Sequence, residues 1–190
     1  MKSLNDSIKE SFEILRENIS FKKPRGIASG YPDFDNMLRG MNKGTLTVFA
    51  SKPSLGKTAF ALNIVHNLTK QTPETGILFC SDLSNTELTF RLLTIASGVK
   101  NSYDTDYQND DVKLLTASVN KLKDYPLYFE EHSGFDEAML ATIKGLHAEQ
   151  NFDLLIADNV RPDECRKLKE LAKELDIAVL ALVSAYSKKD

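Results

Sequence analysis

A short loop between an apolar run and a helical pattern limits the folds open to this chain. Residues 51–58 read Ser-Lys-Pro-Ser-Leu-Gly-Lys-Thr, the run Leu46–Ala50 before them is typical of a β-strand, and a helical pattern begins at Ala59. A strand, a tight loop and a helix in this order direct several backbone N–H groups and a helix N-terminus at one point. The segment therefore predicts a phosphate-binding loop.

The side chains of this loop have the chemistry that a polyphosphate requires. In the pattern Gly-x-x-x-x-Gly-Lys-Ser/Thr, we expect Lys57 to reach the β and γ phosphates and the Thr58 hydroxyl to coordinate Mg²⁺. The first glycine position holds Ser51, whose small side chain is compatible with a tight turn. The alternative is an ordinary turn with Lys57 solvated. The candidate nucleotide-binding residues are Ser51, Lys52, Pro53, Ser54, Leu55, Gly56, Lys57 and Thr58.

Composition places the chain among ordinary globular proteins. Its 190 residues, 42% of them hydrophobic, suit one domain with a core that needs no disulfides. A net charge of -3 provides no general attraction to nucleic acid or to acidic membranes. No apolar run approaches a membrane span, and Asp6, Glu10 and Glu13 lie where a signal peptide needs an apolar core. The two cysteines form no metal-binding spacing, so we expect a cytoplasmic protein with no membrane contact.

Five short apolar runs alternate with helical patterns along the chain. Continuous apolar strands separated by helices predict an α/β fold, with a mostly parallel central sheet and helices on both faces. Ligands of such sheets bind at the carboxyl ends of the strands. The expected strands are 45–50, 77–80, 127–129, 154–157 and 177–182, and the expected helices lie near 57–71, 84–97, 110–123, 135–150 and 163–175.

An amphipathic helix is predicted before this alternating region. Five apolar residues recur at helical spacing and form one stripe, and Pro24 favours a linker after them. We therefore expect a linker helix at 1–22 and a domain at 23–190. The stripe either folds back on its own domain or packs on another chain. Its members are Leu4, Ile8, Phe12, Leu15 and Ile19.

Two aspartates follow apolar strands and are candidates for a nucleotide site. Asp158 ends the fourth strand and is expected to hold Mg²⁺ through its water shell, although it could instead cap the helix near Asp163. Asp82 ends the second strand, beside the loop if that strand neighbours the first, where it would orient or deprotonate an attacking water. Alternatively, Asp82 or Ser84 caps the next helix, with Glu87 as the capping-box partner of Ser84.

With these pieces placed, the sequence resembles the C-terminal ATPase domain of DnaB-type replicative helicases, a RecA-like P-loop NTPase fold. The resemblance implies ATP and Mg²⁺ as ligands. It also implies Lys57 and Asp82 as catalytic side chains, with Thr58 and Asp158 at the metal. The segments that carry it are Gly26–Asp35, Lys52–Ile64, Asp158 and Leu168–Leu175.

Several positions depart from the family pattern. Where the family has a catalytic glutamate, this chain has Asp82, which is shorter by about 1.5 Å. Only Asn159–Pro162 precede the next helix, where the family has a long DNA-contacting loop, and Val183–Ala185 replace an expected glutamine. The family also continues beyond Asp190 with strands that supply an arginine finger, and it carries a separate N-terminal domain. These differences predict a nucleotide-binding module with weak or no hydrolysis.

Two other functions are compatible with the sequence. A helicase-derived interaction protein would bind helicase subunits, or copies of itself, through the N-terminal helix without unwinding DNA. A complete helicase motor would need a basic DNA-facing surface, but the basic clusters lie on predicted helical faces, where solvated charge is usual. The acidic connection Asn101–Asp111 is expected to be a surface loop unsuited to phosphate contact. The sequence therefore gives little support to DNA binding. The basic clusters are Lys121 with Lys123, and Arg166 with Lys167 and Lys169.

Overall fold

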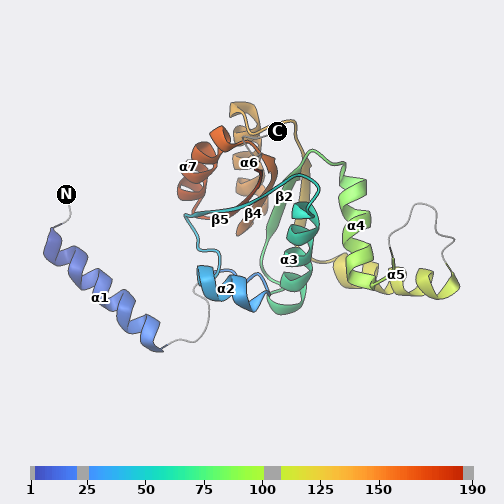
Figure 1. Cartoon of the computed structure of the whole chain (residues 1–190), viewed down its shortest axis with the longest axis horizontal. Coiled ribbons are helices and arrows are strands. Elements are labelled where there is room, and N and C mark those ends of the chain that lie inside the picture. Colours follow the sequence, from blue (N-terminus) through green and yellow to red (C-terminus); the bar gives the residue numbers. More distant parts are fainter. Residues whose placement is uncertain (1–2, 21–25, 101–107, 186–190) are drawn as a thin grey trace.

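The central element of the protein is a parallel sheet, seen in a computed structural model that describes residues 3–20, 26–100 and 108–185. The strands lie in the order β1-β5-β4-β2-β3, and Figure 1 shows the sheet between its covering helices. Every pairing in the sheet is parallel, which confirms the predicted sheet. The strands are β1 (Leu46–Ser51), β2 (Ile77–Ser81), β3 (Leu127–Glu131), β4 (Leu154–Val160) and β5 (Ala178–Ser184).

Each predicted helix is present within a few residues of its expected bounds. The additional helix α2 was not anticipated, because its seven residues are too few to show a helical period. The helices are α1 (Leu4–Ser20), α2 (Pro32–Leu38), α3 (Lys57–Gln71), α4 (Asn85–Ser97), α5 (Asn109–Leu122), α6 (Glu137–Gln150) and α7 (Cys165–Leu175), with a 3-10 turn at Pro162–Glu164. Part of the predicted acidic surface loop is helical, because Asp110 and Asp111 form the first turn of α5; Asp104 and Asp106 lie outside the described residues.

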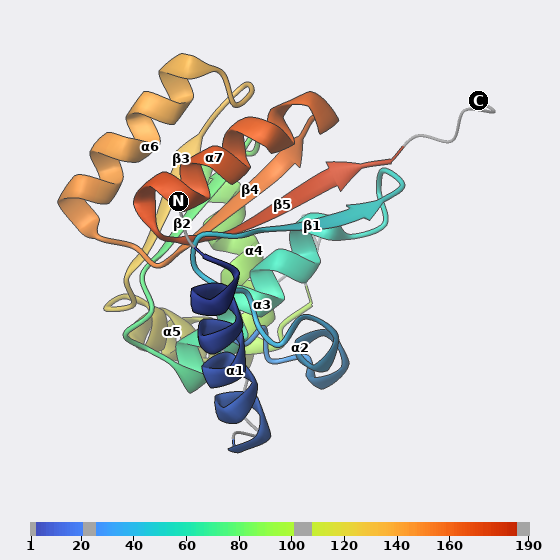
Figure 2. The same ribbon diagram turned by 90° about the vertical axis from the view of Figure 1, so that its left-hand side faces the viewer.

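Helices cover both faces of the sheet, as predicted (Figure 2). One face packs against α6 and α7, and the other packs against α3 and α4, with α5 lying on α4. The strands serve both faces by alternation, since Leu78 and Cys80 belong to the first apolar cluster and Ile77 and Phe79 to the second. Because every pairing in the sheet is parallel, the carboxyl ends of all five strands lie along one edge.

Helix α1 lies apart from the sheet and its covering helices (Figure 1). Its apolar residues Leu4, Ile8 and Phe12 are 79%, 53% and 64% exposed. The structure therefore does not show the stripe folding back on its own domain over these residues. The expected boundary between residues 22 and 23 lies outside the described residues and stays a prediction. Within the described part of the chain, no helix is both long and apolar enough to span a membrane.

Candidate functional site

The loop between β1 and α3 leaves the N-terminus of α3 open. Gly56 precedes the first helical residue with a left-handed φ of 82° and brings no capping side chain. The first N–H groups of a helix have no partner within the helix, so they remain available to an anion. A Cβ added to Gly56 would meet no atom within 4 Å, which shows that the space beside the loop is open.

The serine at the first glycine position is compatible with the observed loop. Ser51 is the last residue of β1, where it pairs with Ser184, and it does not have a positive φ. The left-handed residues of the loop are instead Ser54 and Gly56. A glycine is therefore not required at position 51, because the backbone there has a conformation that any residue adopts.

Lys57 places a buried cation over the loop. Its side chain is only 8% exposed, and its Nζ donates to the carbonyl oxygen of Lys52 at 3.3 Å. No carboxylate among the described residues forms an ion pair with this ammonium group. A buried charge without a counter-charge is costly, so an anion bound beside the loop would relieve that cost.

Asp158 points at the same place from the sheet. Its side chain is 4% exposed, and its Oδ2 accepts hydrogen bonds from Thr58 Oγ1 at 2.7 Å and from Ser81 Oγ at 3.4 Å. The alternative role as a helix cap is wrong, because Asp158 lies within β4 and Arg161 occupies the N-cap position of the following turn. The structure thus brings Asp158 and Thr58 together as the sequence predicted.

These oxygen atoms suit a magnesium ion. Mg²⁺ prefers hard oxygen ligands, uses few protein carboxylates and keeps several of its waters. Thr58 supplies a hydroxyl and Asp158 a carboxylate, and their oxygen atoms already converge. Across the described residues, no group of three or more His, Cys, Asp or Glu is arranged to hold a metal. The donor set therefore fits a metal that a bound phosphate helps to coordinate, rather than a site built from protein ligands alone.

The position of Asp82 differs from the one expected. The sequence placed it beside the loop on condition that β2 neighbours β1, but β5 and β4 separate these two strands. The reason is that the order of strands in a parallel sheet depends on crossovers that local sequence does not encode. Asp82 instead lies next to β4, where its exposed carboxylate accepts a hydrogen bond from Asn159 Nδ2 at 2.9 Å.

The alternative capping role belongs to Ser84 alone. Ser84 is the N-cap of α4, and its hydroxyl accepts a hydrogen bond from the backbone N–H of Glu87 at 3.2 Å. The side chain of Glu87 pairs with Arg91 one turn further along the helix, so the prediction of a reciprocal capping box is not met. Asp82 is therefore not engaged as a helix cap.

Two polar residues at this edge escaped the sequence analysis. Asn159 has a left-handed φ of 55° and contacts Asp82, and Glu164 is a 2% exposed carboxylate that links two loops. An asparagine directly after a strand-ending aspartate was one available signal, since asparagine tolerates this backbone conformation. The spacing of Arg161 and Glu164 was another, because a glutamate three residues after an N-cap position can accept from the N-cap backbone N–H, as Glu164 does from Arg161.

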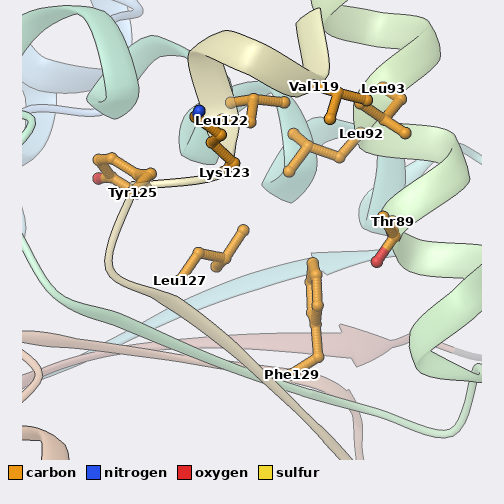
Figure 3. Close-up of a pocket in the computed structure, with 9 residues that line it drawn as sticks. All are labelled: Thr89, Leu92, Leu93, Val119, Leu122, Lys123, Tyr125, Leu127 and Phe129. Carbon is orange, nitrogen blue, oxygen red and sulfur yellow. The ribbon is translucent and has the colours of Figure 1, made fainter. Parts of the chain in front are cut away.

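A separate apolar hollow of about 210 Å³ lies between α4, α5 and β3 (Figure 3). None of its lining residues belongs to the loop between β1 and α3. Tyr125 forms part of its wall. Burial is the main reason that the pKa of the Tyr125 hydroxyl is raised. The apolar lining includes Leu92, Leu93, Val119, Leu122 and Phe129. Its chemistry suits an apolar side chain rather than a phosphate.

Two of the three residues in the basic cluster predicted on α7 form ion pairs with carboxylates. Arg166 pairs with Glu170 at 3.1 Å, and Lys167 pairs with Glu137 at 3.0 Å. These contacts neutralise charge on an exposed helical face. They agree with the interpretation of this cluster as solvated surface charge.

Comparison with known proteins gives a family match over most of the chain. The model of the DnaB-like helicase C terminal domain matches residues 26–162. The replicative DNA helicase DnaC of Bacillus subtilis (strain 168) is 26% identical over 176 residues, and the replicative DNA helicase DnaB of Geobacillus stearothermophilus is 27% identical over 176 residues. Each alignment covers 83% of this chain and 39% of the relative, so the chain spans well under half the length of these relatives.

Solved structures show the same fold. One, titled as the structure of a DnaB-like replicative helicase and its interactions with primase, has a TM-score of 0.82 at 19% identity. It covers 100% of this chain and 51% of that one. The ATPase domain of G40P has a TM-score of 0.81 at 19% identity and covers 99% of this chain and 73% of that one. These likenesses confirm the RecA-like architecture.

Proposed function

The chain belongs to the DnaB-like helicase C-terminal domain family, and we propose that it is a RecA-like module that binds ATP with Mg²⁺ at the loop Ser51–Thr58. One observation carries the proposal. At the open N-terminus of α3, the buried ammonium of Lys57 precedes Thr58 in the first turn, and the Thr58 hydroxyl donates to the buried carboxylate of Asp158 at 2.7 Å. A cation, free backbone N–H groups and metal-ligating oxygens are the parts that a nucleotide triphosphate requires.

Each part has a separate task in binding. The N–H groups at the start of α3 and the ammonium of Lys57 would hold the phosphates, and Lys57 would exchange its hydrogen bond to the Lys52 carbonyl for a phosphate oxygen. Thr58 and Asp158 would hold Mg²⁺, which when bound neutralises charge on the phosphates. Asp82 would accept a proton from the attacking water. Because Asp82 is shorter than the family's glutamate, we expect slow hydrolysis.

Calorimetry with a matched pair of lysine variants tests this proposal. Titration of Mg²⁺-ATP should give saturable heat with the wild-type chain and none with Lys57→Ala. Lys70→Ala removes an exposed lysine from the other end of the same helix and should bind like the wild type. No heat with wild type, or equal loss in both variants, would refute the proposal.

A second candidate function is self-association, or binding to helicase subunits, through α1. The specific observation in its favour is the exposed apolar stripe Leu4, Ile8 and Phe12 on a helix that lies apart from the domain. Apolar residues spaced along one helical face are buried when a partner packs on them. The hollow between α4 and α5 of a second copy has the apolar lining to accept such a side chain.

Light scattering of the whole chain, with and without Mg²⁺-ATP, tests the second candidate. If α1 mediates assembly, the wild-type mass should exceed that of a monomer, and Phe12→Asp should lower it. Ser11→Asp adds the same charge at the neighbouring exposed position and should leave the mass unchanged. A monomeric wild type would contradict self-association, while calorimetry still decides nucleotide binding.

We do not expect this chain to move along DNA. Between β4 and α7 the chain has only Arg161 and the 3-10 turn Pro162–Glu164, which is too short to extend as a DNA-gripping loop. The basic residues Arg166 and Lys167 are paired with carboxylates. We therefore expect no salt-dependent binding to single-stranded DNA, which a fluorescence anisotropy titration at two ionic strengths would measure.

A further inference from the structure

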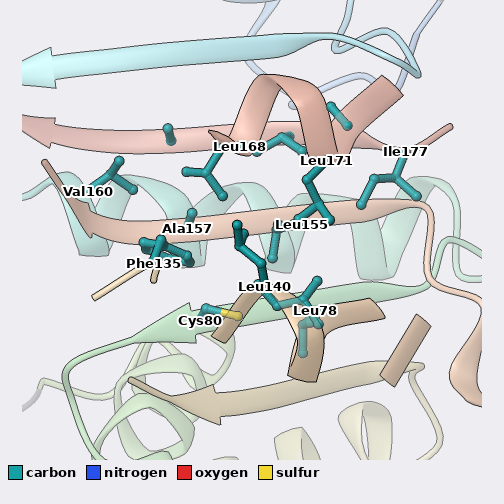
Figure 4. Close-up of a cluster of buried hydrophobic side chains, with 14 of the residues drawn as sticks. Leu78, Cys80, Phe135, Leu140, Leu155, Ala157, Val160, Leu168, Leu171 and Ile177 are labelled. Atoms are coloured by element: carbon teal, nitrogen blue, oxygen red, sulfur yellow. The ribbon is translucent and has the colours of Figure 1, made fainter. Parts of the chain in front are cut away.

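A bulge near the end of β4 turns one side chain out of the normal alternation of the strand. Ala157 belongs to the apolar cluster under α6 and α7, so alternation would put Asn159 on that face as well. Instead Val160 joins that cluster, as Figure 4 shows, and the pairing of β4 with β5 shifts between Ala157 and Val160. Asn159 is the displaced residue, and its φ of 55° is left-handed. Bulges of this kind re-aim side chains next to functional sites.

The re-aimed asparagine connects the two candidate carboxylates. Its backbone N–H donates to Asp158 Oδ1 at 2.8 Å, and its side-chain Nδ2 donates to Asp82 Oδ2 at 2.9 Å. The orientation of the amide follows from chemistry, because a carboxylate only accepts and so must face the NH₂ group. One residue thus donates hydrogen bonds both to the aspartate that faces Thr58 and to the aspartate that follows β2.

Asp82 depends on this contact for its orientation. It is exposed, and the capping of α4 is carried by Ser84 rather than by Asp82. An exposed carboxylate on a rotatable side chain samples several rotamers unless a partner holds it. The amide of Asn159 is the partner that the structure provides.

We propose that Asn159 is a positioning residue that holds Asp82 in line with the γ-phosphate of ATP. The inference rests on the proposed nucleotide-binding function and extends it to the hydrolytic step. In that step the oxygen of the attacking water bonds to the γ-phosphorus while Asp82 takes its proton. The bond to the β–γ bridging oxygen breaks with its electron pair remaining on ADP, so the products are ADP and phosphate. Asn159 acts only through Asp82 and does not exchange a proton.

The test uses Asn159→Gly, which removes the amide but keeps a residue that adopts a positive φ without strain. Asn151→Gly is the matched control, because Asn151 is also exposed and left-handed, with φ of 49°, but ends α6 at the opposite end of β4. Each variant is made in the wild-type and Asp82→Ala backgrounds. The measurements are the dissociation constant for Mg²⁺-ATP by calorimetry, the single-turnover rate of hydrolysis, and the thermal midpoint.

The three measurements distinguish a positioning role of Asn159 from a role in nucleotide binding or in folding. Asn159→Gly should slow single turnover by about 10-fold or more, since misplacement by 1 Å costs on the order of 100-fold. It should leave the dissociation constant within about 2-fold, since glycine keeps the backbone N–H that Asn159 donates to Asp158. In the Asp82→Ala background the same change should have no further effect, because residues that act through one another are not additive. Asn151→Gly should leave the turnover rate unchanged.

Three outcomes would overturn the inference. The first is a turnover rate for Asn159→Gly within 2-fold of the wild-type rate. The second is an equal slowing in both backgrounds, which would mean that Asn159 acts independently of Asp82. The third is a wild-type rate no faster than that of Asp82→Ala, because Asp82 would then have no catalytic role to support. In all three cases retained Mg²⁺-ATP binding leaves the proposed function intact, whereas loss of binding by the wild type refutes the function itself.

Discussion

Replacing Glu164 with alanine measures how much one buried carboxylate stabilises the carboxyl edge of the sheet. Glu164 Oε1 accepts a hydrogen bond from the backbone N–H of Phe135 at 2.9 Å, and Oε2 accepts one from the N–H of Arg161 at 2.8 Å. The first donor precedes α6 and the second follows β4. The side chain therefore joins two connections that are distant in sequence, and alanine would leave both donors without this acceptor.

The expected loss of stability follows from these contacts. A hydrogen bond to a charged acceptor contributes about 1.5 to 3 kcal/mol, so the loss of two costs about 3 to 6 kcal/mol. The ion pair of Glu164 with the mostly exposed guanidinium of Arg161, at 2.8 Å, adds at most about 1 kcal/mol. For a chain of this length each kcal/mol lowers the thermal midpoint by about 2 to 4 °C. The total loss of about 3 to 7 kcal/mol should therefore lower the midpoint of Glu164→Ala by about 6 to 28 °C.

Urea unfolding followed by circular dichroism, together with thermal melts, measures this loss. Glu164→Gln retains one acceptor oxygen and should lose about half as much stability. Glu170→Ala is the control, since it removes an exposed glutamate paired with Arg166 and should cost less than about 1 kcal/mol. If Glu164→Ala and Glu170→Ala are equally stable, the argument that Glu164 satisfies buried donors is wrong.

Two further predictions concern pH and the length of the candidate catalytic side chain. Burial, with the charges of Lys70 and Lys121, lowers the pKa of His66 below its usual 6.5, so the unfolded chain binds a proton that the folded chain disfavours. The contribution of His66 to the free energy of unfolding should be complete above about pH 6.5 and should be lost as the pH drops toward the folded pKa. Urea unfolding at a series of pH values should show a smaller loss for His66→Gln than for the wild type. Equal pH dependence of the two proteins would contradict this. Asp82→Glu should raise the single-turnover rate of ATP hydrolysis by restoring the missing length, and an unchanged or lower rate would disprove that explanation of the short carboxylate.

The sequence predicted most of the fold because its signals are local. Apolar runs and helical periods mark the strands and the long helices, and both are read within a window of about 11 to 18 residues. The loop Ser51–Thr58 was predictable for the same reason, since its chemistry lies in consecutive residues. The proximity of Thr58 and Asp158 was also predictable, because both lie near the carboxyl ends of strands and parallel strands place those ends at one edge.

Features that depend on distant residues were not predictable in this way. Helix α2 lacks a period long enough to detect, but the side chain of Asp35 supports it by accepting from the N–H groups of Ser29 at 2.7 Å and Gly30 at 3.1 Å. Glu164 reads in sequence as a surface glutamate at the start of a helix, yet its carboxylate is buried because Phe135 brings a donor from another loop. Such roles follow from tertiary contacts, which no local pattern contains.

The order of the strands has a consequence for chemistry at the carboxyl edge. With β5 and β4 between β1 and β2, the strand that Asp82 follows is not a neighbour of the strand that leads into the loop. The short side chain of Asp82 therefore needs a neighbouring group that holds it in one orientation. The bulge in β4 supplies one, because Asn159 donates its backbone N–H to Asp158 and its side-chain amide to Asp82. The left-handed backbone of Asn159 and the short side chain of Asp82 therefore have to be interpreted together, and replacing either residue alone changes the geometry that the other one meets.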